Sequence, residues 1–307
     1  MFDRATATAR SALYQKIREF FRERKVIEVE VPLLGCGAAI DPQMQSMHVD
    51  QGDKPRYLQT SPEYFLKRLL CEGSGDVYSI CKAFRAGEVG RLHNPEFSLL
   101  EWYRVGFTLS ELIQEVLDLL TIVGASEPVQ EFTYAERFQS STGLNPHTAE
   151  YSKLQSLASE SGLVGELDHK GLQQFLMAKM VEPKFPSGLV ILTDFPASQA
   201  ELANIENDEN GCRIAKRFEV YWNRVELANG YDELVDAKEQ HRRFEASRAE
   251  RKALAMSETE FDIAFQKAVE RGMPECSGVA LGLDRLLMLL LEKENLAETL
   301  SFPWKEI

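Results

Sequence analysis

The chain has 307 residues, 44% hydrophobic and 27% charged, a composition typical of a globular protein with a sizeable core. Its 35 Lys and Arg against 48 Asp and Glu give a formal net charge of −13, which disfavours extensive contact with nucleic acid. Five scattered cysteines and five histidines favour neither a disulfide framework nor a zinc cluster. The most apolar stretch, 281–291, is interrupted by Asp284 and Arg285, so we expect a cytoplasmic protein that does not span a membrane.

Hydrophobic periodicity divides the chain into helices and strands. In the first third we predict a helix at 10–24, a strand at 26–31 and a short strand at 57–60. A helix that begins at Ser61-Pro62 and two strands, at 77–85 and 96–104, follow. Helical periods broken by Gly and Pro predict a helical insertion at roughly 109–185. In the remainder we predict strands at 189–193 and 213–222 and a polar helix at 236–255. A final strand and helix together span 277–291. A single α+β domain over 1–307 is the simplest interpretation, although the length also permits two.

A charged loop between two predicted strands carries the first candidate site. It contains Arg85, Glu88, Arg91, His93 and Asn94. Such loops are often only solvated. Planar guanidinium groups, however, bind phosphate bidentately, so the two arginines also indicate a receptor for an anion.

A buried glutamate is predicted in the following strand. Glu101 and Tyr103 lie two residues apart and should share one face, while Trp102 points to the other. A carboxylate among apolar neighbours needs a cation. An internal salt bridge and the ammonium group of a ligand are both consistent with the pattern.

A predicted hairpin brings two more carboxylates together. If Asn223-Arg224 form a two-residue turn, Tyr221 pairs with Glu226, and Glu219 lies diagonally across from Glu226 on the same face. Oxygen ligands at this spacing suit magnesium, with phosphate completing its shell. The alternative is an edge hairpin whose glutamates lie in water.

The segment from Gly278 to Arg285 joins a strand to an apolar helix and places an arginine in its first turn. Glycine spacing alone is weak support for a nucleotide site. Positive charge at the start of a helix adds to the preference for an anion.

Three segments resemble, in order, the signature motifs of class II aminoacyl-tRNA synthetases. They are Lys25 to Leu34 with Pro32, Phe84-Arg85 through His93-Asn94-Pro95-Glu96-Phe97, and Gly278 to Arg285. This resemblance implies a mainly antiparallel sheet flanked by helices. Thr60-Ser61-Pro62-Glu63 and Glu226-Leu227-Ala228-Asn229-Gly230 resemble the lysyl-tRNA synthetase subgroup.

Within that subgroup, the chain is similar to the elongation factor P lysine ligases, the stand-alone paralogues that modify a protein lysine. The predicted first helix begins so early that we expect no anticodon-binding domain ahead of it. Glu101-Trp102-Tyr103-Arg104 and Phe195-Pro196-Ala197-Ser198-Gln199-Ala200 carry the similarity further.

The resemblance implies a role for each matching residue. Arg85 and Arg285 would be catalytic, and Glu219 and Glu226 would hold Mg²⁺. The residues implied for the amino-acid substrate are Ser61, Pro62, Glu63, Glu101, Tyr103, Asn229 and Glu233. Those implied for ATP are Arg85, Glu88, His93, Asn94, Glu226, Leu227, Gly282 and Arg285.

Two positions depart from the lysyl-tRNA synthetase pattern. Arg85-Ala86-Gly87-Glu88 displaces by one residue the acidic group that contacts adenine in that subgroup, so Glu88 is its proposed counterpart. Ala280 stands where those synthetases carry glycine and the ligases carry alanine. A single methyl group in a pocket discriminates by about 1 to 3 kcal/mol, which favours a substrate other than α-lysine, and the family implies (R)-β-lysine.

The expected activity is therefore ATP-dependent activation of (R)-β-lysine, or lysine, and its transfer to a lysine of elongation factor P. The first motif also implies a homodimer. We expect no tRNA and no membrane as partners. The alternatives are a truncated lysyl-tRNA synthetase that charges tRNA, and a non-catalytic regulatory paralogue.

Overall fold

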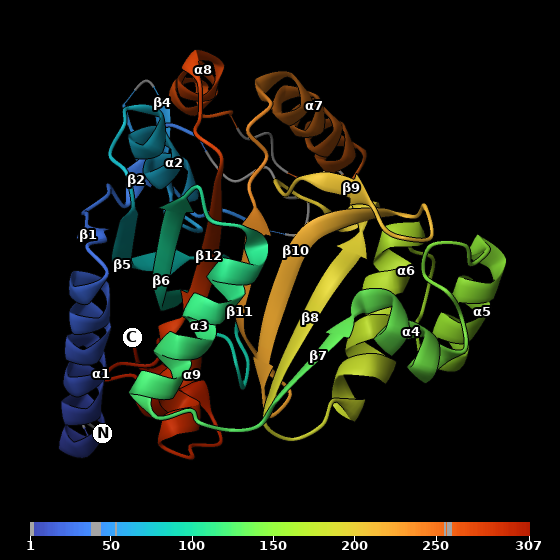
Figure 1. Ribbon diagram of the computed structural model, residues 1–307, viewed down its shortest axis with the longest axis horizontal. Helices are drawn as coiled ribbons and strands as arrows, with labels where there is room; N and C mark the ends of the chain where they lie inside the picture. The colour runs from blue at the N-terminus through green and yellow to red at the C-terminus, as the bar shows by residue number, and fades with distance from the viewer. Residues whose placement is uncertain (1–2, 38–43, 53, 255, 257–259) are drawn as a thin grey trace. The chain divides into compact units, whose positions relative to one another are not determined.

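The computed structural model describes residues 3–37, 44–52, 54–254, 256 and 260–307 (Figure 1). The chain divides into two compact parts. The first comprises Met1–Ser126 and Glu233–Ile307, and the second comprises Glu127–Asp232. Among the described residues, no helix combines the length and apolar character needed to cross a bilayer.

The first part is built on a mainly antiparallel sheet. Its strands lie in the order β1 (Ile27–Glu28), β5 (Val77–Phe84), β6 (Glu96–Val105) and β12 (Cys276–Gly282). Only β1 and β5 are parallel, and β6 pairs antiparallel with both β5 and β12. A smaller antiparallel sheet has the order β2 (Leu34–Gly35), β4 (Lys54–Leu58) and β3 (His48–Gln51).

Helices pack against this sheet on both faces. One group consists of α1 (Arg4–Glu23), α3 (Leu109–Val123) and α9 (Leu283–Leu290). From α1, Phe21 stacks on Tyr78 of β5 at 4.3 Å and meets Trp102 of β6 edge-on at 5.4 Å between ring centroids. The other group consists of α2 (Glu63–Cys71), α7 (Ala237–Ala253) and α8 (Ile263–Arg271).

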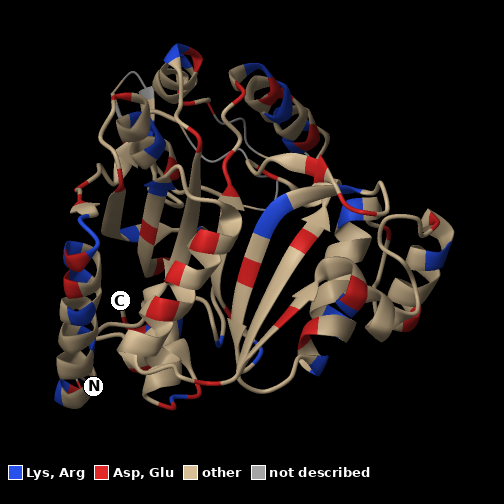
Figure 2. Ribbon diagram, viewed as in Figure 1, with Lys and Arg blue, Asp and Glu red and all other residues tan. Residues whose placement is uncertain are grey.

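The polar helix α7 carries charges of both signs along its length (Figure 2). Glu239 pairs with Arg242 and Arg243 at spacings of three and four residues, and Asp236 caps the first turn. Such pairs compensate in part for a weak apolar face, which is limited here to Phe244 and a few neighbours. The predicted helix at 236–255 is confirmed to residue 253, and Ala255 lies outside the described residues.

The second part has its own sheet and core. Its strands run in the order β11 (Val225–Asp232), β10 (Arg213–Trp222), β8 (Leu189–Pro196) and β7 (Val129–Thr133), and β9 (Ile205–Asn207) also pairs with β10. Its helices are α4 (Tyr134–Thr142), α5 (Tyr151–Glu160), α6 (His169–Leu176) and the π-helix Met177–Val181. Short 3₁₀ helices lie at Glu182–Lys184 and Ala197–Gln199, and in the first part at Leu296–Thr299 and Trp304–Glu306.

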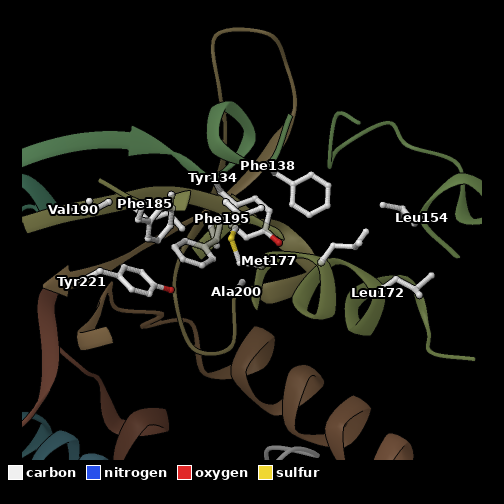
Figure 3. Packing of buried hydrophobic residues seen from close by; sticks show 14 of the residues in the cluster. Tyr134, Phe138, Leu154, Leu172, Met177, Phe185, Val190, Phe195, Ala200 and Tyr221 are labelled. Atoms are coloured by element: carbon white, nitrogen blue, oxygen red, sulfur yellow. The ribbon is translucent and has the colours of Figure 1, made fainter. Parts of the chain in front are cut away.

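Aromatic rings fill the core of the second part. Figure 3 shows Phe138 and Tyr134 of α4 beside Phe195 of β8, and the rings of Tyr134 and Phe195 lie 5.2 Å apart. Tyr221 of β10 meets Phe185 edge-on at 4.8 Å. These contacts fix β8 and β10 against the helices on the face of the sheet that also carries Glu219.

The predicted α+β fold with a mainly antiparallel sheet is confirmed, and so is the hairpin turn. Asn223 and Arg224 adopt φ of +50° and +68°, and Trp222 pairs with Val225. One prediction was wrong. The strand expected at 26–31 contains only Ile27 and Glu28, and Ile27 is 55% exposed instead of half-buried. The segment 109–185 also contains a strand that its helical periods did not indicate: β7, which pairs in parallel with β8.

Candidate active site

The carboxylates of Glu63, Glu101 and Glu233 gather beside β6 and α2 in the first part, and we call this cluster the carboxylate pocket. Glu101 and Tyr103 share a face as predicted, and Trp102 points to the other side, where it donates to Glu115. The Ser61 hydroxyl donates to Glu101 Oε2 at 2.6 Å, and the Tyr103 hydroxyl donates to Oε1 at 2.8 Å. Both carboxylate oxygens therefore have neutral donors, which orient the group without cancelling its charge.

Two glutamates in this pocket hold their protons unusually tightly. Burial, reinforced by the charge of Glu63, raises the pKa of Glu101 to about 7. Burial likewise raises the pKa of Glu233 to about 8, although Lys67 opposes the shift. The sequence left two possible cations for Glu101, an internal side chain and the ammonium group of a ligand. Among the described residues Glu101 forms no ion pair, and Lys67 only lowers its pKa by attraction over a longer distance. A cationic ligand would complete the pocket.

Two residues of β12 shape the floor of the pocket. Gly278 is paired with Tyr103, and a Cβ atom there would lie 2.3 Å from the Tyr103 ring and 2.6 Å from Glu233 Oε1. Any side chain at this position would therefore displace two of the pocket residues. Ala280 is paired with Glu101, so its methyl group lies on the face that carries the carboxylate.

Sequence reasoning missed Lys67, although it lies in the middle of the pocket. The side chain is completely buried, and Nζ lies 2.5 Å from Glu63 Oε1 and 2.6 Å from Glu233 Oε2. The pairing with Glu63, four residues earlier on α2, was available as a signal. The contact with Glu233 depends on the tertiary fold.

The first residue of the predicted anion receptor, Arg85, lies directly after β5. Arg85 packs over Phe97 at 5.1 Å from guanidinium carbon to ring centroid, and its backbone N–H donates to Pro95 O. Its Nε is buried and has no hydrogen-bond partner among the described residues. A guanidinium N–H in that position is suited to a phosphate or carboxylate oxygen.

Arg285 reaches the same loop from the first turn of α9. Its Nη2 lies 2.8 Å from His93 Nε2, and its Nε donates to Leu92 O at 3.2 Å. Asn94 is held at both ends of its amide, donating to Glu96 O and accepting from Trp304 N. The structure thus brings Arg285 into contact with His93, the neighbour of Asn94 in the chain, and their role in binding an anion stays a prediction.

Two further residues of the first part are predicted to contact ATP: Glu88, three residues after Arg85, and Gly282, three residues before Arg285. Their roles stay predictions. Glu88 is half-buried and follows Gly87, whose φ of +78° turns the loop. Gly282 precedes α9, whose first turn is anchored by Asp284 through Ser98 N at 2.6 Å and an ion pair with Arg10 at 2.6 Å. The side chain of Arg91 donates to Glu294 O.

The carboxylates of the hairpin lie in the second part. Tyr221 pairs with Glu226, and the register shifts next to Tyr221, so that Glu219 pairs with Asn229. Glu219 accepts from Arg217 at 2.6 Å and from the Tyr221 hydroxyl at 2.5 Å. Burial raises the pKa of Glu219, and the neighbouring charge of Glu226 acts in the same direction, against Arg217. The two carboxylates are thus close enough to repel each other, which a cation would relieve.

Arg217 also went unnoticed in the sequence, although it lies two residues before Glu219 on the same face of β10. Of the remaining predicted residues, Leu227 is buried in β11, and Asn229 Oδ1 is buried without a hydrogen-bond partner among the described residues. Pro62 is buried at the start of α2, where Glu63 N donates to Ser61 Oγ.

Comparison with known proteins identifies the class. The family model for class II tRNA synthetases (D, K and N) matches residues 3–306. The chain therefore belongs to the class II tRNA synthetase family, which confirms the predicted resemblance and fold.

Several curated proteins narrow the similarity further. The chain is 40% identical over 306 residues to the elongation factor P–(R)-β-lysine ligase of Actinobacillus succinogenes, covering 97% of this chain and 94% of that protein. It is 41% identical over 302 residues to the ligase of the same name from Haemophilus influenzae, covering 95% and 93%. It is 40% identical over 310 residues to that of Sodalis glossinidius, covering 97% and 94%. The predicted relationship to these ligases is confirmed.

Proposed function

We propose that the protein is an ATP-dependent ligase that activates (R)-β-lysine, or lysine, as an adenylate and transfers it to a lysine side chain of elongation factor P. One observation carries the proposal: among the described residues, the carboxylates of Glu63, Glu101 and Glu233 gather around a single lysine, Lys67, whose side chain is buried. Such an excess of carboxylate suits an amino acid with two amines. The names of the relatives support the acceptor and the donor.

In the first step, a carboxylate oxygen of the amino acid attacks the α-phosphorus of ATP, and pyrophosphate leaves. Arg85, with its unpartnered buried Nε, would bind the α-phosphate and the substrate carboxylate. Arg285 would bind the distal phosphates from the start of α9, with His93 and Asn94 beside it. Fixed cations and N–H groups stabilise the charge that develops on phosphate without reorganising during the reaction.

Carboxylate oxygens are the donors that magnesium prefers, so Glu219 and Glu226 fit this ion. Each oxygen of Glu219 accepts one hydrogen bond, which leaves a lone pair on each for a metal. When bound, magnesium would offset phosphate charge. Arg217 and Tyr221 would orient Glu219, and Glu226 and Leu227 would provide the ATP contacts of β11. Asn229 would accept from a substrate amine.

In the second step, the acceptor lysine nitrogen attacks the adenylate carbonyl carbon, an amide forms, and AMP leaves. The amine must first lose a proton, which at pH 7 costs roughly 4.6 kcal/mol from a reference pKa near 10.4. A phosphate oxygen of the adenylate is the proposed acceptor of that proton.

The proposed assembly is a homodimer formed through the first motif. Its apolar residues Ile27, Leu33 and Leu34 are 55%, 41% and 38% exposed, which leaves surface for a second copy. Sedimentation that is independent of concentration at the mass of one chain would contradict this assembly. tRNA is not a proposed partner.

The test mixes the protein with ATP, (R)-β-lysine and elongation factor P and follows the intact mass of the factor. We expect a gain of one β-lysyl group. No gain would reject the proposal, and aminoacylation of tRNA instead would favour a tRNA-charging synthetase.

Arg285→Ala should abolish pyrophosphate exchange while leaving the circular dichroism spectrum unchanged. The matched control is Arg248→Ala, which removes an exposed arginine of α7 paired with Glu245. Exchange retained by Arg285→Ala would remove Arg285 from the site.

A further inference from the structure

Lys67 occupies the amino-acid pocket in an unusual way. Its ammonium group is completely buried, bridges Glu63 and Glu233, and lies 5.9 Å from the centroid of the Tyr103 ring. Burial opposes its charge, but the two carboxylates outweigh burial and raise the pKa of Lys67. The lysine therefore stays charged at every physiological pH.

The charges in the pocket do not cancel. With all three carboxylates ionised, Glu63, Glu101 and Glu233 contribute −3 and Lys67 contributes +1, so the sum is −2. A diamino acid with both amines protonated supplies +2, while its carboxylate is directed to Arg85. The pocket and such a ligand are therefore matched only when Lys67 is present.

We propose that Lys67 is a positioning residue whose buried ammonium bridges Glu63 and Glu233 and favours their ionised forms, so that the pocket binds an amino acid with two protonated amines. The inference deepens the proposed function and rests on it for the identity of the ligand. It assigns Lys67 no contact with the reacting atoms.

The groups that face Lys67 are few. Glu63 and Cys71 come from α2, Glu101 and Tyr103 from β6, and Glu233 from the segment before α7. Burial raises the pKa of Cys71 and of Tyr103, so both stay neutral near pH 7. On α8, Arg271 pairs with Glu72, which follows α2, and the helix-capping Asp262 pairs with Arg68 of α2. Glu101 and Glu233 are therefore the groups whose protonation changes between pH 6 and pH 9.

The first test compares Lys67→Met with the wild-type protein in lysine-dependent pyrophosphate exchange from pH 6.5 to pH 9. Without the lysine, Glu233 binds its proton more tightly, and each unit of pKa costs tenfold in affinity below that pKa. We expect the KM for lysine to rise at least tenfold at pH 7 and the difference to shrink toward pH 9, while kcat changes less than threefold. The matched control is Lys82→Met, which removes a part-exposed lysine paired with Glu96.

The proposal would be overturned if Lys67→Met lost kcat alone, or if the ratio of its KM for lysine to that of the wild type were the same at every pH. Chemical rescue separates charge from packing. Lys67→Ala should regain at least fivefold in kcat/KM with added propylammonium and nothing with 1-propanol. Equal rescue by the two compounds would assign Lys67 to packing only.

A measurement on the wild-type protein does not depend on folding of the variants. In protein labelled with ¹³Cε-lysine, one resonance should fail to titrate up to pH 10.5 and should move when lysine is added without ATP. Titration of every lysine resonance near pH 10.4 would overturn the proposal. If the wild type binds lysine in this way but catalyses no exchange with any diamino acid, the proposed function fails and the assignment of Lys67 stands.

Discussion

Both parts of the chain bury carboxylates beside a cation, but they balance the charge differently. In the first part, Lys67 faces Glu63 and Glu233, with Glu101 nearby. In the second part, Arg217 contacts Glu219 at 2.6 Å and Glu201 at 3.0 Å, and it also donates to Gln199 O. The ammonium is a point charge, whereas the guanidinium is planar and lies 4.5 Å from the Phe195 ring centroid.

The difference indicates what each cluster is for. In the second part, Arg217 and the hydroxyls of Tyr221 and Tyr231 donate to all four carboxylate oxygens of Glu201 and Glu219. Burial opposes ionisation of Glu201, but Arg217 outweighs it and lowers the pKa of Glu201. That cluster mainly orients Glu219. The first cluster has three carboxylates and one lysine, and burial raises the pKa of Glu101 to about 7 and that of Glu233 to about 8, so a cationic ligand would favour the ionised form of both.

Removing the cation from the Arg217 cluster of the second part should give the largest loss of stability. Arg217→Met leaves the buried Glu219 and the more exposed Glu201 without their cation, which costs about 3 kcal/mol of unfolding free energy. Urea unfolding measures the loss. Arg213→Met, at an exposed position on the same strand, is the control and should change stability by less than about 0.5 kcal/mol. A change of similar size in both variants would show that the cluster does not carry this stability.

The cluster around Lys67 should make the unfolding free energy depend on pH. The pKa values of Glu101 and Glu233 are about 7 and about 8 in the folded chain, against a reference near 4.3 in the unfolded chain. The folded state therefore binds more protons, and these groups lower the unfolding free energy as pH rises from about 5 to about 8. Urea unfolding at fixed pH steps measures the slope, and saturating lysine should reduce it.

The raised pKa of Glu219 also lowers the unfolding free energy as pH rises. The control is therefore the double variant Glu101→Gln/Glu233→Gln, which removes only the part of the pH dependence that comes from the first cluster. A wild-type unfolding free energy that increases from pH 6 to pH 8 would contradict the prediction.

The smallest expected effect concerns the wall of the receptor. Ala280→Gly removes a methyl group beside Glu101 and should shift the ratio of kcat/KM for (R)-β-lysine and α-lysine by about tenfold toward α-lysine. Pyrophosphate exchange with each amino acid measures the ratio. An unchanged ratio would place the selectivity elsewhere in the pocket.

Local patterns predicted much of this molecule. The shared face of Glu101 and Tyr103 followed from the two-residue period of a strand, and the turn at Asn223-Arg224 fixed the partner of Glu226. The strand at 26–31 was predicted too long, because alternation alone does not reveal where a pairing partner ends. The strand β7 was missed, since its parallel partner follows only after several helices.

The sequence by itself determined the α+β elements, the family and the residues of its motifs, because these depend on residue type and short spacing. Only the tertiary structure decided that Lys67 meets Glu233, that Gly278 leaves room for both Tyr103 and Glu233, and that Arg217 pairs with Glu201 as well as Glu219. The physical reason is burial: residues distant in the chain share one desolvated space, and there their charges set the pKa values and the balance that a ligand must complete.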